Sequence, residues 1–131
     1  MSAMEIKIIK ILANHPRVRL AFLFGSCARE QQRPSSDIDL AVAARQKLDK
    51  QEKMALIDDL ALSFGRPIDL VDLNAVSGTI LQQVLCKGVL LINKQQSLYA
   101  KLIIKMWYNQ ADFMPVYNMV QQKKVKAFAY G

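Results

Sequence analysis

The sequence predicts an α/β domain, in which helices flank a short mixed β-sheet and a helical segment follows at the C-terminus. Stretches with apolar residues at helical spacing alternate with short, almost continuous apolar runs that are typical of strands. The 131 residues are 52% hydrophobic, which is enough for one compact core. We therefore expect a core over residues 1–94 and a helical extension over residues 95–131, packed on the same domain.

A helix and a buried strand are predicted first. Residues 3–13 carry apolar side chains at helical spacing, and Pro16 lies just beyond them, where the helix should end. Residues 18–24 are almost all apolar, as expected of a central strand covered on both faces. Residues 26–33 should then form a short helix or a turn, which Pro34 ends.

The middle of the chain is predicted to alternate between strand and helix. Residues 36–43 form a strand with one apolar face and aspartates on the other. Asp49 and Glu52 have the spacing of a capping box, and Gly65 stands where a left-handed glycine ends a helix. A strand over residues 68–73 follows. The apolar positions of the helix at helical spacing are Met54, Ile57, Leu60, Ala61 and Phe64.

The last third is predicted to hold a short helix, a strand and a longer helix. Ser77 caps the short helix and Gly88 closes it, and residues 89–92 form the fourth strand. Residues 95–122 read as helical, with a kink before Pro115. The inward positions of the short helix are Ile80, Leu81, Val84 and Leu85.

A glycine–serine turn and a pair of aspartates indicate the chemistry of the chain. Gly25 and Ser26 follow the first predicted strand, and such a turn can hold phosphate oxygens through backbone N–H groups and a hydroxyl. Asp37 and Asp39 stand two positions apart on the next strand, so their side chains point to the same face. Two carboxylates facing a phosphate-binding turn are what Mg²⁺-dependent phosphoryl or nucleotidyl transfer requires.

The third predicted strand supplies a further carboxylate. Asp69 and Asp72 are an odd number of positions apart, so they lie on opposite faces. If this strand pairs beside that of Asp37 and Asp39, one of the two completes a three-carboxylate cluster. Such a cluster can hold two metal ions about 3.5–4 Å apart. Without metal its charges would repel and raise at least one pKa, so we expect metal binding. A surface or N-cap role is the alternative for Asp69.

Composition argues against several other classes of protein. Lys7 and Lys10 interrupt the N-terminal apolar run, and no apolar stretch approaches the roughly 20 residues of a membrane span, so we expect neither a signal peptide nor a membrane protein. Two cysteines without CxxC spacing predict no zinc site and favour a reduced, cytoplasmic setting. The single histidine, His15, precedes a proline at a helix end, where capping or exposure is expected rather than catalysis.

The chain has a net charge of +7, and much of it comes from lysines in the last third of the sequence. One interpretation is a solvated helix face with a basic tail, and the other is a surface for an acidic partner. No helix-turn-helix, RRM or zinc-finger pattern accompanies the charge, so we expect no direct nucleic-acid binding. The basic residues in this region are Lys94, Lys101, Lys105, Lys123, Lys124 and Lys126.

These motifs resemble those of the DNA polymerase β-type nucleotidyltransferase superfamily. The resemblance rests on Gly25-Ser26, followed after ten residues by the Asp-Ile-Asp run 37–39, and on the Ile-Asp-Leu-Val run 68–71. The sequence of residues 23–29 and the small size of the chain resemble those of the minimal nucleotidyltransferases, which are the antitoxin partners of HEPN-domain toxins. The similarity covers roughly residues 18–92. Within the motif, Cys27 and Glu30 differ from the residues most common in the family.

The resemblance implies a polymerase β-like fold and a role for each motif residue. Gly25 and Ser26 would hold the triphosphate of ATP, the usual donor in the family. Asp37 and Asp39 would coordinate Mg²⁺, with two ions implied, and Asp69 would be the third ligand and would activate the incoming hydroxyl. The resemblance further implies that AMP passes to a tyrosine of the cognate HEPN toxin and silences its RNase activity.

The sequence thus predicts a cytoplasmic antitoxin that AMPylates a HEPN toxin within a hetero-oligomer. Two alternatives stay open. The antitoxin could neutralise its partner by contact with little catalysis, or the chain could be a nucleotidyltransferase for a small, aminoglycoside-like alcohol. The second alternative needs a further domain to shape the substrate pocket, unless a dimer supplies one. Arg29 could contact phosphate or lie on a helix surface, and the basic, aromatic C-terminal segment is the candidate docking surface.

Overall fold

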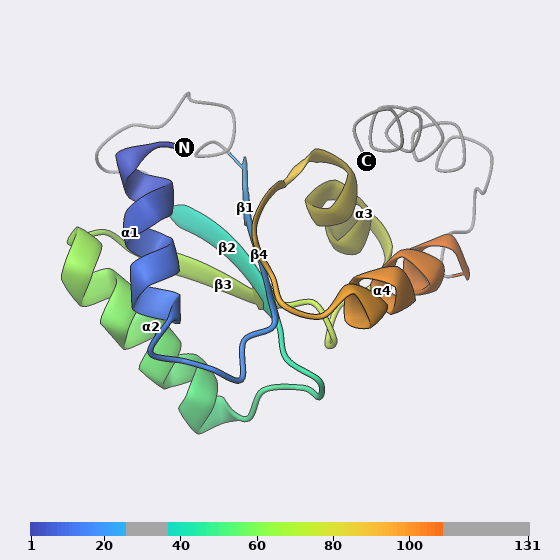
Figure 1. Cartoon of the computed structure of the whole chain (residues 1–131), viewed down its shortest axis with the longest axis horizontal. Coiled ribbons are helices and arrows are strands. Elements are labelled where there is room, and N and C mark those ends of the chain that lie inside the picture. Colours follow the sequence, from blue (N-terminus) through green and yellow to red (C-terminus); the bar gives the residue numbers. More distant parts are fainter. Residues whose placement is uncertain (26–36, 109–131) are drawn as a thin grey trace.

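The computed structural model describes residues 1–25 and 37–108 (Figure 1). Helices and strands alternate along this part of the chain, as predicted, so the α/β class is confirmed. The elements are α1 (Ala3–Leu12), β1 (Leu20–Phe24), β2 (Ile38–Ala43), α2 (Lys50–Phe64), β3 (Ile68–Asp72), α3 (Gly78–Lys87), β4 (Val89–Asn93) and α4 (Gln96–Tyr108).

The strands form a single mixed sheet in the order β3-β2-β1-β4. β2 and β3 run parallel, with Asp39 opposite Asp69. β1 is antiparallel to both neighbours, so that Phe24 lies opposite Asp39 and Leu23 lies opposite Val89. The end of β1 and the beginnings of β2, β3 and β4 therefore meet at one end of the sheet, which we call the Asp39 end.

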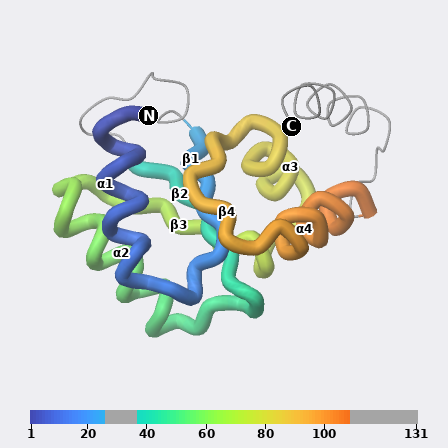
Figure 2. Tube along the Cα trace, in the orientation of Figure 1, coloured from blue at the N-terminus to red at the C-terminus, as the bar shows by residue number. Residues whose placement is uncertain are grey.

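Each face of the sheet is covered by a pair of helices (Figures 1 and 2). α1 and α2 pack on one face, in a buried cluster that includes Leu23 and Leu40. α3 and α4 pack on the other face, in a cluster that includes Phe22, Ala41 and Leu81. Because β1 contributes buried side chains to both clusters, it is the central, doubly covered strand that its apolar run predicted.

The predicted ends of the second helix are confirmed. At its start the Asp49 side chain accepts from the Glu52 N–H, and the Glu52 side chain accepts from the Asp49 N–H. At its end Gly65 takes the left-handed conformation, with φ of 62°. Ser77 does stand at the start of α3, but its side chain makes no capping hydrogen bond there. The chain instead enters that helix through Gly78, whose φ is positive.

One side chain predicted to face inward, that of Ile80, is exposed instead, and so is that of Met54, an apolar position at helical spacing in α2. Met54 is 51% exposed and Ile80 is 47% exposed. The buried positions of α2 are Leu56 and Leu60, and α3 buries Leu81. Successive residues of a helix are turned by about 100°, so Met54 lies far around the helix from Leu56. The spacing of apolar residues alone does not show that Met54 and Ile80 lie outside the buried face of their helices.

α4 packs against the core through Leu98, Leu102 and Met106, which lie in the same buried cluster as Phe22. The rest of the helix predicted to residue 122, with the kink before Pro115, lies outside the described residues. The division of the chain at residue 94 therefore stays a prediction. Within the described part of the chain, no helix has the length and apolar character that crossing a bilayer requires.

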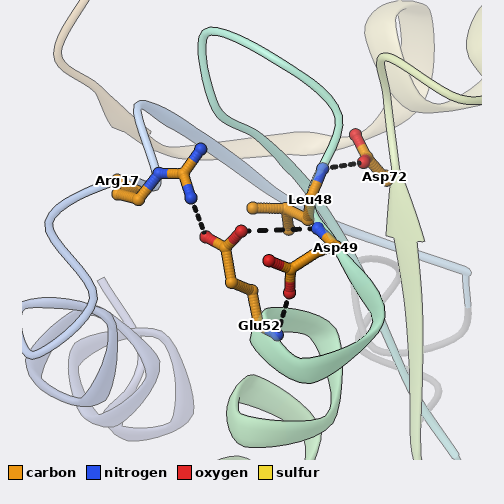
Figure 3. Close-up of polar contacts among 5 residues, drawn as sticks. All are labelled: Arg17, Leu48, Asp49, Glu52 and Asp72. Carbon is orange, nitrogen blue, oxygen red and sulfur yellow. Dashed lines mark hydrogen bonds and ion pairs between the residues drawn. The ribbon is translucent and has the colours of Figure 1, made fainter.

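The buried carboxylate of Asp72 holds the loop between β2 and α2 (Figure 3). Asp72 is the last residue of β3, at the end of the sheet opposite Asp39. Asp72 is only 3% exposed, and its two oxygens accept from the backbone N–H groups of Leu48 (2.8 Å) and Asn74 (3.0 Å). The capping box of α2 comes directly after Leu48, and its Glu52 also pairs with Arg17 (2.5 Å). Asp72 therefore holds the start of α2 in place.

Replacing Asp72 with Ala should destabilise the domain by about 2–4 kcal/mol, because the buried Leu48 N–H would lose its acceptor. Asn at the same position keeps one acceptor oxygen, so Asp72→Asn should lose about half as much. Urea unfolding followed by circular dichroism measures both values. An Asp72→Ala chain as stable as the unaltered one would contradict this structural role.

Candidate active site

Asp39 lies between two residues that are distant from it in the sequence. Its register partner on β1 is Phe24, and its partner on β3 is Asp69. The carboxyl groups of Asp39 and Asp69 share a hydrogen bond. The expected pairing of the two aspartate-bearing strands is confirmed, and it brings Asp69 rather than Asp72 beside Asp39.

Gly25 lies against the carboxylate of Asp39. It follows β1 directly and has φ of 71°, a left-handed conformation that L side chains rarely adopt. A Cβ atom at this position would lie 3.0 Å from Cγ of Asp39 and would overlap its Oδ2. A glycine is therefore required here both by the backbone conformation and by the space that Asp39 occupies.

Partial burial and the neighbouring acidic groups change the ionisation of Asp39. Its pKa is raised from 3.8 to about 6. Partial burial is the largest cause, followed by the hydrogen bond and the charge of Asp69 and by the charge of Asp37. The repulsion expected from the sequence is thus present, although burial outweighs it.

Asp37 stands beside this pair as an exposed residue that directly precedes β2. Its charge reaches Asp39, since it contributes to the raised pKa. Over residues 1–25 and 37–108, however, no three acidic, histidine or cysteine side chains are grouped closely enough to hold a metal ion. Asp39 and Asp69 therefore form a pair with Asp37 as an acidic neighbour, and the three-carboxylate cluster stays a prediction.

Other residues singled out in the sequence lie elsewhere. Ser26 and Arg29, like Cys27 and Glu30, fall outside the described residues. His15 joins α1 to α2, because its Nε2 atom lies 2.6 Å from Oδ2 of Asp59. This contact at a helix end agrees with the non-catalytic role expected of the histidine.

Sequence reasoning missed one neighbour of the candidate site, the turn between α3 and β4. A Cβ atom built on Gly88 would lie 3.4 Å from the carbonyl oxygen of Leu23, so this turn abuts the end of β1. Gly88 was expected only to close a helix. Its place beside the Asp39 end depends on the order of strands in the sheet, for which the local sequence holds no signal.

Comparison with known protein families agrees with this geometry. The family described as "Polymerase beta, Nucleotidyltransferase" matches residues 6–97, a range that contains all four strands. The protein adenylyltransferase MntA of Shewanella oneidensis is 41% identical to this chain over 106 residues. The aligned segment covers 79% of this chain and 76% of MntA.

Solved structures extend the similarity to nearly the whole chain. A chain in the crystal structure of a toxin–antitoxin complex with AMP-PNP is 31% identical, with a TM-score of 0.67, and the match covers 97% of this chain and 98% of that one. A second structure holds a tri-AMPylated Shewanella oneidensis HEPN toxin in complex with an MNT antitoxin. A chain in it is 30% identical, with a TM-score of 0.61, over 97% of this chain and 92% of that one.

Proposed function

This chain belongs to the polymerase β nucleotidyltransferase family, and we propose that it is an antitoxin that transfers AMP from MgATP to a tyrosine hydroxyl of a HEPN RNase toxin. Membership of the family gives the reaction class, which is nucleotidyl transfer. The relatives narrow the acceptor to a protein, since MntA is named a protein adenylyltransferase and one matched structure contains an AMPylated HEPN toxin. The chain and its toxin form a hetero-oligomer in the cytoplasm, where ATP and RNA are both available.

The observation that carries this proposal is the contact of Gly25 with Asp39, beside Asp69. Three segments far apart in the sequence bring a phosphate-turn glycine and two carboxylates to one end of the sheet. A purely structural role does not explain why Asp39 is partly buried beside two further carboxylates, although burial and these neighbours together raise its pKa to about 6. A site that binds cations and phosphate does explain it.

We assign Asp37, Asp39 and Asp69 to Mg²⁺, with two ions in the active complex. The donor set fits, because a hard divalent cation prefers carboxylate oxygens and would relieve the crowding of charge around Asp39. Bound Mg²⁺ would neutralise charge on the triphosphate and clamp the attacking and leaving oxygens. Above pH 6 Asp39 is mostly ionised and available as a ligand.

The protein groups act chiefly by position. Asp69 accepts the proton of the tyrosine hydroxyl as its oxygen bonds to the α-phosphorus of ATP. The bond from that phosphorus to the bridging oxygen breaks, and pyrophosphate leaves. Gly25, which has no side chain, lets the turn lie directly against the Asp39 carboxylate, and we assign the triphosphate contacts to Gly25, Ser26 and Arg29. Such positioning suits a reaction that needs little covalent chemistry from the protein.

Labelled ATP tests the proposal. The chain is incubated with Mg²⁺, ATP labelled in its α-phosphate and the protein encoded beside it, and the modified residue is mapped by mass spectrometry. We expect label on a partner tyrosine, and no label when Asp37→Ala and Asp39→Ala are combined.

Two other outcomes decide for the alternatives. Tight binding and full neutralisation by that double variant would show an antitoxin that acts by contact. Transfer of AMP to small alcohols but never to the partner would show a small-molecule nucleotidyltransferase.

A further inference from the structure

Lys87 ends α3 at the Asp39 end of the sheet. It directly precedes Gly88, which lies against the carbonyl oxygen of Leu23, and β4 then begins with Val89 opposite Leu23. Gly25 follows Leu23 by two residues. The lysine therefore stands near Gly25, although the two residues are far apart in the sequence.

α3 also lies on the same face of the sheet as the carboxylates. Asp39 and Ala41 are two positions apart on β2, so they point to the same face. Ala41 is buried against α3, where Leu81 and Val84 belong to its cluster. α3 and α4 cover this face together, away from α1 and α2 (Figure 1). Lys87 is thus on the layer toward which Asp39 projects.

The charge of Lys87 is available for a ligand. The residue is exposed, and no carboxylate in the described part of the chain pairs with it. The sequence holds no acidic residue between Asp72 and Asp112. Asp37, Asp39 and Asp69 lie on the other side of Gly25, so a ligand over this glycine has acidic groups on one side and a cation on the other.

The distance between β4 and β2 across β1 suits a polyphosphate. Neighbouring strands are about 4.8 Å apart, so β4 lies about 10 Å from β2 across β1. Lys87 directly precedes the Gly88 turn that leads into β4, and a lysine has a flexible stem whose ammonium group is a compact partner for phosphate oxygens. We propose that Lys87 binds the triphosphate of ATP on the side of Gly25 opposite Asp39. This inference rests on the proposed function, because it takes ATP as the substrate.

A lysine in the last turn of a helix can also serve only to stabilise the negative end of that helix. The two roles differ in what they do to ligands. Removing a lysine that only stabilises the helix lowers the stability of the fold and leaves ligand affinity unchanged. Removing a lysine that binds phosphate lowers the affinity for ATP and for inorganic tripolyphosphate and leaves the affinity for adenosine unchanged.

The test compares Lys87→Met with Lys94→Met, since the two lysines stand at opposite ends of β4. Lys94 is also exposed, and its N–H bonds to the Arg19 carbonyl oxygen (2.8 Å), at the end remote from Asp39. Calorimetric titration measures the Kd of the full chain for MgATP, Mg-tripolyphosphate and adenosine. We expect Lys87→Met to raise the Kd for MgATP and for Mg-tripolyphosphate about fivefold to tenfold and to leave the Kd for adenosine unchanged.

The KM for ATP in partner AMPylation should rise in parallel while kcat stays within about twofold, and Lys87→Arg should restore most of the affinity. MgATP and tripolyphosphate affinities within about twofold of the unaltered chain would overturn the inference, as would an equal loss in Lys94→Met. The proposed function fails separately, if the unaltered chain binds MgATP but transfers no AMP to its partner. Absence of any MgATP binding would overturn both.

Discussion

Asp39→Asn should lower the rate of AMP transfer by about 10³-fold, because it removes one of the carboxylates assigned to Mg²⁺. Asparagine has nearly the same shape and lies within the same strand pairing, so the fold should be retained. Single-turnover transfer of labelled AMP to the partner measures the loss. The control is Asp58→Asn, which removes an exposed carboxylate from α2 and should keep full activity.

The same substitution should stabilise the metal-free chain at neutral pH. In the folded chain the pKa of Asp39 is about 6, against an ordinary value of 3.8. The folded state therefore binds the proton more tightly, and the stability of the unaltered chain declines as the pH rises from about 4 to 6. Since the site is only partly buried, solvent screening limits the difference to the order of 1 kcal/mol.

Urea unfolding without Mg²⁺ checks this expectation. Asp39→Asn should be the more stable chain at pH 7.5, and the two chains should converge near pH 4. Added Mg²⁺ should stabilise the unaltered chain and have less effect on the variant, since only the former keeps the full ligand set. A variant that is less stable at pH 7.5 and unaffected by pH would contradict the crowding of charge around Asp39.

Gly25→Ala should lower AMP transfer by about 10²-fold or more. The new Cβ atom would overlap Oδ2 of Asp39 and must displace either that carboxylate or the turn. Displacement of a catalytic group by about 1 Å can cost 10²-fold in rate. The substitution also places alanine at a φ of 71°, which costs about 1–2 kcal/mol in stability.

Gly65→Ala is the matched control for this substitution. Gly65 has a similar φ of 62°, but nothing lies within 4 Å of a Cβ atom built there. Both variants should lose similar backbone stability in thermal unfolding, and only Gly25→Ala should lose transfer activity. Equal activities of the two variants would show that the contact with Asp39 has no catalytic consequence.

Local patterns predicted most of the elements and the motif residues. The capping box of Asp49 and Glu52 and the left-handed Gly65 were correctly placed, because such signals depend on neighbours in the sequence. The apolar run ending at Phe24 correctly indicated a central strand. The alternation of strand side chains also separated Asp69 from Asp72 before their surroundings were known.

What the sequence could not provide depends on contacts between distant segments. The overlap of Gly25 with Asp39 requires β1 to lie beside β2, and the place of Gly88 requires β4 to lie beside β1. Apolar spacing alone does not show which stripe of a helix meets the sheet, so it could not indicate that Met54 and Ile80 are exposed. The buried role of Asp72 likewise depends on Leu48, a residue 24 positions away.

Neutralisation by AMP transfer leaves a covalent mark on the toxin, whereas neutralisation by contact ends when the two proteins are separated. The partner toxin is incubated with the chain and MgATP, separated from the chain under mild denaturation, refolded, and assayed for both intact mass and RNase activity. We expect a toxin that carries AMP and stays inactive after separation, while toxin treated with Asp39→Asn regains its activity. A toxin of unaltered mass that recovers full RNase activity once the chain is removed would contradict neutralisation by AMP transfer.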